Sequence, residues 1–206
     1  MNVLLLNGSP HEKGCTYTGL AEVAQTLEKN GVATEIFWLG NKAIHPCIAC
    51  GKCKETGACI FDDVVNEILA KLDGIDGIVV GSPVHYAAAS GAISMVMDRV
   101  FYAGAGKLAK KPGAAIVSCR RGGASAAFDE LNKYFSINNM PIATSQYWNQ
   151  IHGNTAEEAK QDREGMQTMR TLGENMAWLL KCIEAGRKAG VKEPAYEAWD
   201  KTNFIR

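Results

Sequence analysis

Short apolar runs alternate along the chain with segments whose apolar residues recur at helical spacing. Mainly apolar runs cover residues 3–6, 78–80 and 114–118. Unbroken runs of this length are typical of strands that are buried on both faces, as in a parallel sheet. Residues 33–39 and 142–144 predict two further strands. The chain therefore contains five predicted strands.

Helices are predicted between and after these strands. The first carries Leu20, Val23, Ala24 and Leu27 on one face and ends before Gly31, a typical C-terminal cap. The other predicted helices are one with Asp62 as its N-cap and apolar residues at 65, 68, 69 and 72, and those over 90–101, 124–138 and 155–189. The last begins with the capping-box pattern Thr155-x-x-Glu158.

This alternation of strands and helices predicts an α/β fold, in which helices cover both faces of a parallel sheet. Right-handed crossovers and five strands favour a flavodoxin-like, doubly wound sheet with the order 2-1-3-4-5. No linker or repeat interrupts the pattern, so we expect a single domain over residues 1–206. A cysteine-rich insertion, residues 45–61, follows the second strand.

Composition narrows the class of protein. The net charge is zero and no basic run occurs, so nothing favours nucleic acid as a partner. Residues 77–97 lack charged side chains, but Gly-Ser-Pro and a histidine interrupt them, which favours a buried strand, loop and helix over a membrane span. The N-terminal residues are too short and uncharged for a signal peptide. We therefore expect a soluble, cytoplasmic protein without a membrane partner.

Three loops rich in glycine and serine, residues 7–17, 81–90 and 118–124, leave the predicted strands at one edge of the sheet. Ligands bind at this carboxyl edge in open α/β sheets. The first loop offers hydroxyls and backbone N–H groups at a helix N-terminus, which suit a phosphate, although a polar loop that only caps its helix has the same composition. The dinucleotide pattern G-x-G-x-x-G and the Walker A pattern are both absent from this loop.

The other two loops offer different groups. In GSPVHYAAASG, His85 and Tyr86 stand among small residues against which a flat ring could lie, although a lone histidine is more often structural. In SCRRGGAS, two arginines accompany flexible backbone, and either arginine could be an ordinary surface charge.

The stretches NGSPHEKGCT and GSPVHYAAASGAISMVMDR resemble the flavin-binding loops of NAD(P)H-dependent FMN reductases and multimeric flavodoxin-like proteins, over about residues 1–150. The resemblance implies that the phosphate of FMN is held by Ser9, His11, Cys15, Thr16 and Tyr17. It implies that the isoalloxazine ring is flanked by Pro83, Val84, His85 and Tyr86, and that its other edge is closed by Ser118, Arg120 and Gly123. His11 and Cys15 replace the arginine and asparagine of the family pattern, so hydroxyls and N–H groups should hold the phosphate more than a fixed cation does.

Four of the seven cysteines lie in CIACGKCKETGAC, residues 47–59, at the spacing C-x2-C-x2-C-x5-C. Four thiolates from one short segment suit a [4Fe-4S] cluster. Two alternatives remain: tetrahedral zinc, although the usual long gap between cysteine pairs is missing, and free redox thiols. The motif resembles that of iron–sulfur flavoproteins, which implies Cys47, Cys50, Cys53 and Cys59 as cluster ligands. We expect the insertion at the carboxyl edge beside the flavin loops, and Cys182 in the core.

The resemblance implies an FMN-dependent oxidoreductase that moves electrons from NAD(P)H or a protein donor, through FMN and a [4Fe-4S] cluster, to a quinone, a nitro or azo compound, or a redox protein. The cofactor carries the chemistry, so no catalytic side chain is predicted. Relatives suggest a homodimer or homotetramer. Three alternatives stay open: a non-catalytic electron carrier, an FMN reductase without a cluster, and a regulatory module without flavin.

Overall fold

The computed structural model describes residues 1–202, so the last four residues of the predicted domain lie outside the described residues. One sheet runs through the molecule, with the order β2-β1-β3-β5-β6, and β4 pairs antiparallel with β3. The strands are β1 (Asn2–Asn7), β2 (Ala33–Trp38), β3 (Gly77–His85), β4 (Ala88–Ala89), β5 (Gly113–Cys119) and β6 (Gln150–His152). The long strands are parallel, which confirms the predicted flavodoxin-like order.

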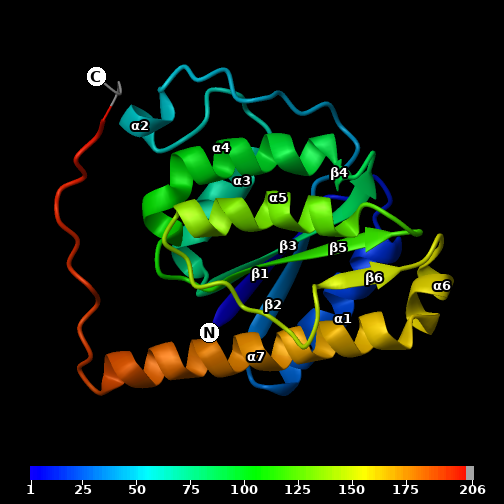
Figure 1. Cartoon of the computed structure of the whole chain (residues 1–206). Coiled ribbons are helices and arrows are strands. Elements are labelled where there is room, and N and C mark those ends of the chain that lie inside the picture. Colours follow the sequence, from blue (N-terminus) through cyan, green and yellow to red (C-terminus); the bar gives the residue numbers. More distant parts are fainter. Residues whose placement is uncertain (203–206) are drawn as a thin grey trace.

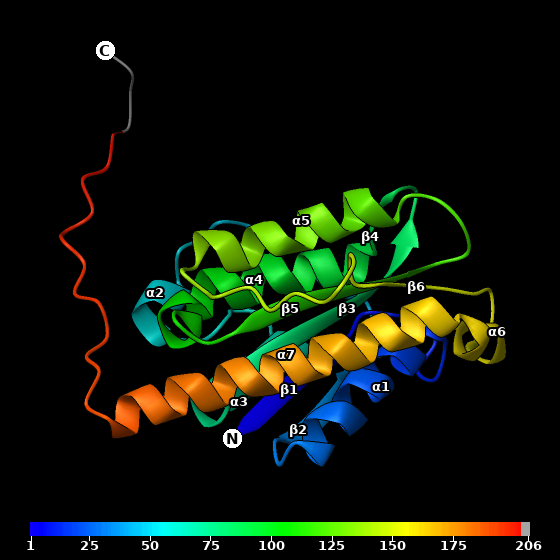
Figure 2. The same cartoon turned by 60° about the horizontal axis from the view of Figure 1, so that its bottom comes forward.

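Helices cover both faces of the sheet, as Figures 1 and 2 show. One face carries α1 and α7, which pack against each other, and the other face carries α3, α4 and α5. The helices are α1 (Cys15–Lys29), α2 (Cys53–Thr56), α3 (Val64–Lys71), α4 (Gly91–Leu108), α5 (Ala124–Ile137), α6 (Ala156–Gln161) and α7 (Arg163–Lys188), with a short 3-10 turn over Leu72–Gly74.

The unbroken apolar runs are explained by two separate cores. In β1, Leu4 and Leu6 face the core under α3, α4 and α5, whereas Val3 and Leu5 face the core under α1 and α7. Side chains alternate between the faces of a strand, so a strand covered on both sides needs apolar residues at every position.

The last strand of the parallel order is β6, Gln150–His152. The prediction of a strand at 142–144 is therefore wrong. Ile142 forms only an isolated bridge with Gly113, at the start of β5. Further along, Asn149 is buried and donates from Nδ2 to the carbonyl of Ala115 at 2.9 Å. This bond fixes the chain beside the second half of β5, where the regular pairing begins.

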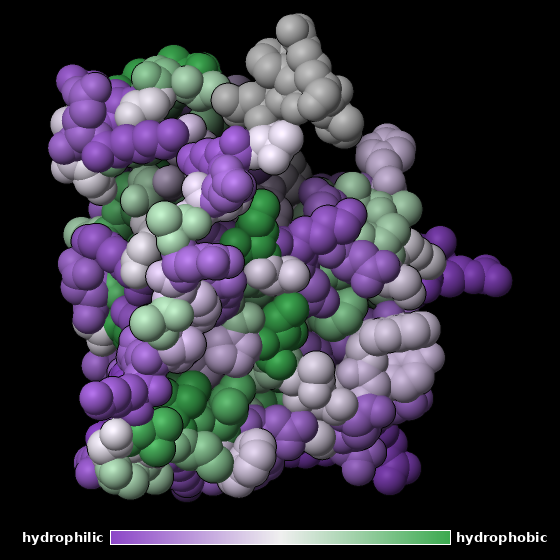
Figure 3. Space-filling view, turned by 60° about the vertical axis from the view of Figure 1, so that its left-hand side comes forward, coloured by the Kyte–Doolittle hydropathy of each residue, from purple (hydrophilic) through white to green (hydrophobic). Residues whose placement is uncertain are grey.

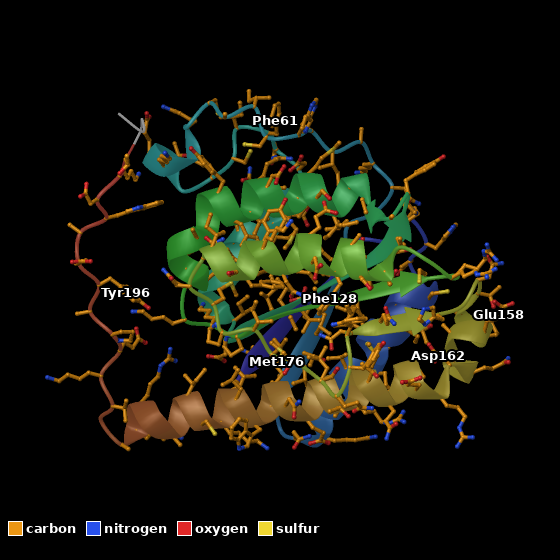
Figure 4. The ribbon with its side chains drawn as sticks, in the orientation of Figure 1. Phe61, Phe128, Glu158, Asp162, Met176 and Tyr196 are labelled. Carbon is orange, nitrogen blue, oxygen red and sulfur yellow. The ribbon has the colours of Figure 1, made fainter. Side chains whose placement is uncertain are left out.

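Three helix boundaries also differ from prediction. The helix predicted over 90–101 is α4, which continues to Leu108. The expected helix over 155–189 is divided at Asp162, whose side chain accepts a hydrogen bond from the Gly165 N–H at 2.9 Å and thereby caps α7 (Figure 4). Thr155 caps α6, as its pattern predicted. The N-cap of α3 is Asp63 rather than Asp62, because the Asp63 carboxylate accepts from the Val65 N–H.

Within residues 1–202, no helix is both long and apolar enough to cross a membrane. The charge-free stretch 77–97 forms β3, β4 and the start of α4. On the side of the molecule that carries α2 and the C-terminal segment, apolar groups are interspersed with polar ones (Figure 3).

Candidate functional site

The first loop, residues 7–17, contacts the segment 81–90 at the carboxyl edge of the sheet. The Gly8 N–H donates to the Gly81 carbonyl at 2.9 Å, and the Ser90 hydroxyl donates to the Gly8 carbonyl at 2.8 Å. A Cβ atom on Gly8 would lie 2.6 Å from the Cβ of Ile93. Only glycine allows this approach, so the residue type at position 8 decides how closely the two loops pack.

The first loop is held by its own polar groups and by Trp38 of β2. The Asn7 Oδ1 accepts from the Ser9 N–H at 3.1 Å, and the Ser9 Oγ accepts from the His11 N–H at 3.1 Å. The Trp38 indole donates to the Ser9 carbonyl at 2.8 Å. Ser9 is therefore buried and fixed, whereas the side chain of His11 is exposed.

The N-terminus of α1 follows this loop, and within residues 1–202 its N-cap residue makes no side-chain cap bond. Its N-cap is Gly14, and its first turn contains no acidic residue. The first N–H groups of a helix lack helical partners, and the helix dipole favours an anion beside them. Cys15 donates from Sγ to the Gly153 carbonyl, and burial raises the pKa of its thiol, so it adds no negative charge here. The arrangement suits a phosphate group.

The buried hydroxyl of Thr16 joins the first loop to the third. Its Oγ1 lies 2.8 Å from the Oγ of Ser118, at the end of β5. The bond places Ser118 beside the first loop, and its predicted role at the other edge of the ring stays a prediction. Tyr17 is half-buried, and the Lys13 ammonium lies 4.1 Å from its ring centroid.

The second loop is a tight hairpin between β3 and β4. Val84 pairs with Ala89, and His85 pairs with Ala88. Tyr86 and Ala87 between them have left-handed φ angles of 51° and 61°. Tight hairpins of this kind favour Asn-Gly, and other residues there store strain, which is common at functional sites. The turn leaves Tyr86 fully exposed at its tip.

The third loop lies against this hairpin. Gly123 has a φ of 90°, and a Cβ atom there would lie 2.7 Å from the Ala87 Cα and 3.0 Å from a methyl group of Val84. Pro83 is half-buried and pairs with Ser118 in the sheet. His85 and Arg120 are exposed. Ser9, Thr16 and Ser118 are thus buried polar residues of these loops, and Val84 and Ala87 lie against Gly123.

The cysteine-rich insertion begins at this edge but does not stay there. It runs back over α4, where Phe61 lies above the helix (Figures 1 and 4). Ser90 caps α4 at the edge, and Arg99, which lines the cysteine pocket, is about 14 Å further along the helix at ~1.5 Å per residue. The expected place beside the flavin loops is therefore corrected to one along α4.

All four clustered cysteines line one pocket. Its wall is formed by Cys47, Ile48, Cys50, Gly51, Cys53, Cys59, Ile60, Phe61, Arg99 and Tyr102. Cys47 and Cys50 are exposed, and Cys53 and Cys59 are half-buried. No group of three or more His, Cys, Asp or Glu side chains in the described chain is arranged as a metal-ion site. The thiols share a pocket, but they do not converge as a preformed ligand set.

Arg99 is a buried cation in this pocket, and the sequence analysis missed it. Its Nη1 and Nη2 donate to the two carboxylate oxygens of Asp63 at 2.7 and 2.9 Å, and its Nε and Nη2 donate to the Cys59 Sγ at 3.2 and 3.1 Å. Burial opposes its charge, but the bonds to Asp63 and Cys59 outweigh burial and raise the pKa of Arg99. The available signal was an arginine between Val96 and Val100 on the apolar face of a predicted helix.

The prediction that Cys182 belongs to the core is wrong, because it is exposed on α7. The buried face of that helix includes Met176, Ala177 and Leu180. Position 182 is two residues beyond the last of these and therefore lies off this face.

Solved structures share the fold at low sequence identity. RosB, solved with a bound flavin-derived intermediate, superposes with a TM-score of 0.69 at 14% identity, covering 100% of this chain and 94% of that one. A flavodoxin from the domain Archaea gives a TM-score of 0.61 at 15% identity, covering 88% and 99%. At these identities the likeness shows a flavodoxin-like fold.

Sequence comparison gives the family. The iron-sulfur flavoprotein MJ1083 of Methanocaldococcus jannaschii is 33% identical over 192 residues, which cover 89% of this chain and 100% of that protein. An iron-sulfur flavoprotein of Methanosarcina thermophila is 26% identical over 192 residues, which cover 91% and 99%. Residues 1–155 match the family model described as NADPH-dependent FMN reductase. The chain therefore belongs to the NADPH-dependent FMN reductase family of flavin oxidoreductases, and relatives along nearly its whole length are iron-sulfur flavoproteins.

Proposed function

We propose that this chain is an FMN-dependent oxidoreductase that takes electrons from NAD(P)H or a protein donor. The observation that carries the proposal is the meeting of three loops at the uncapped N-terminus of α1, where free N–H groups and buried hydroxyls suit the phosphate of FMN. Membership of the family supports the same cofactor. Bound FMN supplies the hydride and electron chemistry, and the protein binds and orients it.

Each part of the edge has a proposed task. Ser9, Thr16 and the N–H groups of Cys15, Thr16 and Tyr17 bind the phosphate, and His11 approaches it from the exposed side. Ser118 orients the Thr16 hydroxyl through their hydrogen bond. Val84, His85 and Tyr86 flank the ring with Pro83 behind them, and Arg120 and Gly123 border its other edge. The exposed Tyr86 offers a surface against which a flat acceptor or a nicotinamide can stack.

The four clustered cysteines are proposed to hold a [4Fe-4S] cluster. The donor set supports this, because four thiols from one short segment line one pocket beside a buried cation. The names of the relatives support it as well. Cys47 and Cys50 lie in an exposed, irregular segment, and left-handed residues at Ala49 and Gly51 give that segment its bends. The cluster would pass electrons to a quinone, a nitro or azo compound, or a redox protein.

Spectroscopy of anaerobically purified protein tests both cofactors. We expect flavin absorption, one FMN per chain, and four iron and four sulfide per chain, together with NADPH oxidation when a quinone is present. Protein without flavin would contradict the function as a whole. One zinc per chain, or no metal, would remove the cluster and leave an FMN reductase. Bound FMN without turnover of any small acceptor would identify an electron carrier instead.

A charge at the proposed phosphate position tests the flavin site itself. Ser9→Glu places a carboxylate where Ser9 is now buried, so we expect FMN binding to be abolished. His11→Gln serves as the matched control, because His11 is exposed and its loss should weaken binding only modestly. Unchanged flavin content in Ser9→Glu would show that FMN binds elsewhere.

We also propose that the chain forms a homodimer or homotetramer and acts in the cytoplasm without nucleic-acid or membrane partners. Light scattering of the holoprotein tests the assembly, and a monomeric mass would contradict it.

A further inference from the structure

Arg99 ties the two ends of the cysteine-rich segment together. Its Nη1 donates to the His45 carbonyl at 3.2 Å, before the first cysteine. Its Nη2 donates to the Cys59 Sγ at 3.1 Å and to the Phe61 carbonyl at 3.4 Å, at and after the last cysteine. The segment between these ends contains one short helix, α2. A single side chain from α4 therefore holds both ends of an otherwise irregular segment.

Asp63 fixes the orientation of this guanidinium. Both carboxylate oxygens accept from Arg99, and the same carboxylate caps α3. The Phe61 ring covers the guanidinium at 5.2 Å, and the Arg99 side chain is 1% exposed. Planar guanidinium groups suit such paired geometry, and a lysine could not satisfy all of these acceptors together. Asp63 and Phe61 thus hold the guanidinium of Arg99 in one orientation.

The contact with sulfur has an electrostatic consequence. Reduction adds one negative charge to an iron–sulfur centre, and hydrogen bonds to its cysteine sulfurs and nearby positive charge stabilise the reduced form. Asp63 balances the charge of Arg99, so the effect rests on the N–H···S bonds, which burial strengthens because water does not compete for them. Two buried N–H groups directed at the sulfur of Cys59 should therefore raise the reduction potential.

We propose that Arg99 is a positioning residue of the cysteine site, which holds the ligand segment closed and raises the reduction potential of the metal centre through its N–H···S bonds to Cys59. The inference rests on the proposed function, because it requires the cluster. It assigns Arg99, a residue outside the cysteine motif, to the proposed cluster site. Arg99 belongs to α4, the helix that begins at the proposed flavin site.

A double variant separates the hydrogen bonds from the charge. Arg99→Met with Asp63→Asn removes one positive and one negative charge, so the net local charge is unchanged, and asparagine still caps α3. Replacing a buried ion pair with groups of similar size is often tolerated. The control is Lys54→Gln, which removes a cation that lies 5.1 Å from the ring of Tyr102, a pocket residue, without any bond from Lys54 to a cysteine sulfur among the described contacts.

The readouts are iron and sulfide per chain, the rate of iron loss to a chelator, and the midpoint potential from an anaerobic redox titration followed by electron paramagnetic resonance. FMN content reports folding. We expect the double variant to keep FMN, to hold iron about 10–100-fold more weakly, as for other residues that support metal ligands, and to have a more negative potential. Lys54→Gln should behave as the parent protein does.

Unchanged iron retention and potential in the double variant would overturn the inference while leaving the proposed cluster intact. Parent protein without iron and sulfide would overturn the proposed cluster, and the inference with it. If the double variant loses FMN as well, Arg99→Lys takes its place. It keeps the ion pair with Asp63 but lacks the paired N–H groups of the guanidinium. A more negative potential in that variant supports the inference, and parent-like behaviour overturns it.

Discussion

Thr16 and Ser118 are 102 residues apart in the chain, yet their hydroxyl oxygens are 2.8 Å apart and buried. The bond joins the first turn of α1 to the end of β5. It therefore links two of the three loops proposed to bind FMN, and it does so through polar groups that have little access to water.

Removing either hydroxyl should leave the other unsatisfied. We expect Thr16→Val and Ser118→Ala each to reduce the free energy of unfolding by about 1–3 kcal/mol. The double variant should lose less free energy of unfolding than the two single variants together. The second change removes the buried hydroxyl that the first change left without a partner. Urea denaturation measures these energies, and FMN titration should show a larger loss of affinity in Thr16→Val. Additive energies would mean that the two hydroxyls act independently.

The contact at Gly8 predicts a second effect on the flavin edge. Gly8→Ala would place a Cβ atom 2.6 Å from the Ile93 Cβ and 3.0 Å from the Gly81 carbonyl oxygen. We expect a loss of about 1–3 kcal/mol in stability through overpacking, together with weaker FMN binding. Gly91→Ala is the control, because a Cβ atom there meets nothing within 4 Å. Thermal unfolding with and without FMN compares the two, and equal effects would contradict the prediction.

The strained hairpin at Tyr86 and Ala87 predicts that a change which raises stability lowers FMN affinity. Changing Tyr86 and Ala87 to Asn and Gly supplies the residues that prefer left-handed turns, so we expect stability to rise by about 1 kcal/mol. FMN affinity should fall, because the aromatic ring is lost. Ala87→Gly alone should keep the affinity. An equal affinity in the double variant would show that Tyr86 does not contact the flavin.

Thiol labelling of the holoprotein should distinguish the cysteines. Cys182 is exposed, whereas burial raises the pKa of both Cys15 and Cys119 and so suppresses their reactive thiolates. We expect iodoacetamide to label Cys182 alone in the anaerobic protein, and the four clustered cysteines as well after the metal is removed. Mass spectrometry identifies the sites. Rapid labelling of Cys47 and Cys50 before metal removal would contradict their role as ligands.

Tyr134 predicts a dependence of stability on alkaline pH. Burial and a hydrogen bond to Asp98 raise the pKa of its hydroxyl well above the ordinary value of 10.0. The folded state therefore favours the protonated form. Its contribution to stability is complete below about pH 10 and is lost as the pH rises through the folded pKa. Tyr134→Phe should decline less steeply than the parent in urea denaturation above about pH 10. Parallel curves would show that Tyr134 does not govern this range.

Much of the fold follows from the sequence by itself, because its signals are local. Apolar runs such as 3–6 and 78–80 favour burial on both faces, and the sheet covered by helices on both sides provides it. The strand order and the three loops at the carboxyl edge follow from that alternation. The four cysteines were identified by spacing alone, and all four line one pocket.

Tertiary structure decided what local pattern could not express. Strand β6 lies at Gln150–His152, beside the bond from Asn149 to Ala115. A strand of three residues is too short to show a periodic pattern in the sequence. The cysteine-rich segment lies over α4 rather than at the flavin edge. Arg99 reaches Cys59 across 40 residues of sequence, and a buried arginine becomes stable only when the fold brings Asp63 and a sulfur to it. Contacts between residues distant in sequence depend on how the layers of the fold pack. The residues that hold the candidate site residues in place, such as Ser118 and Arg99, therefore follow from the tertiary structure.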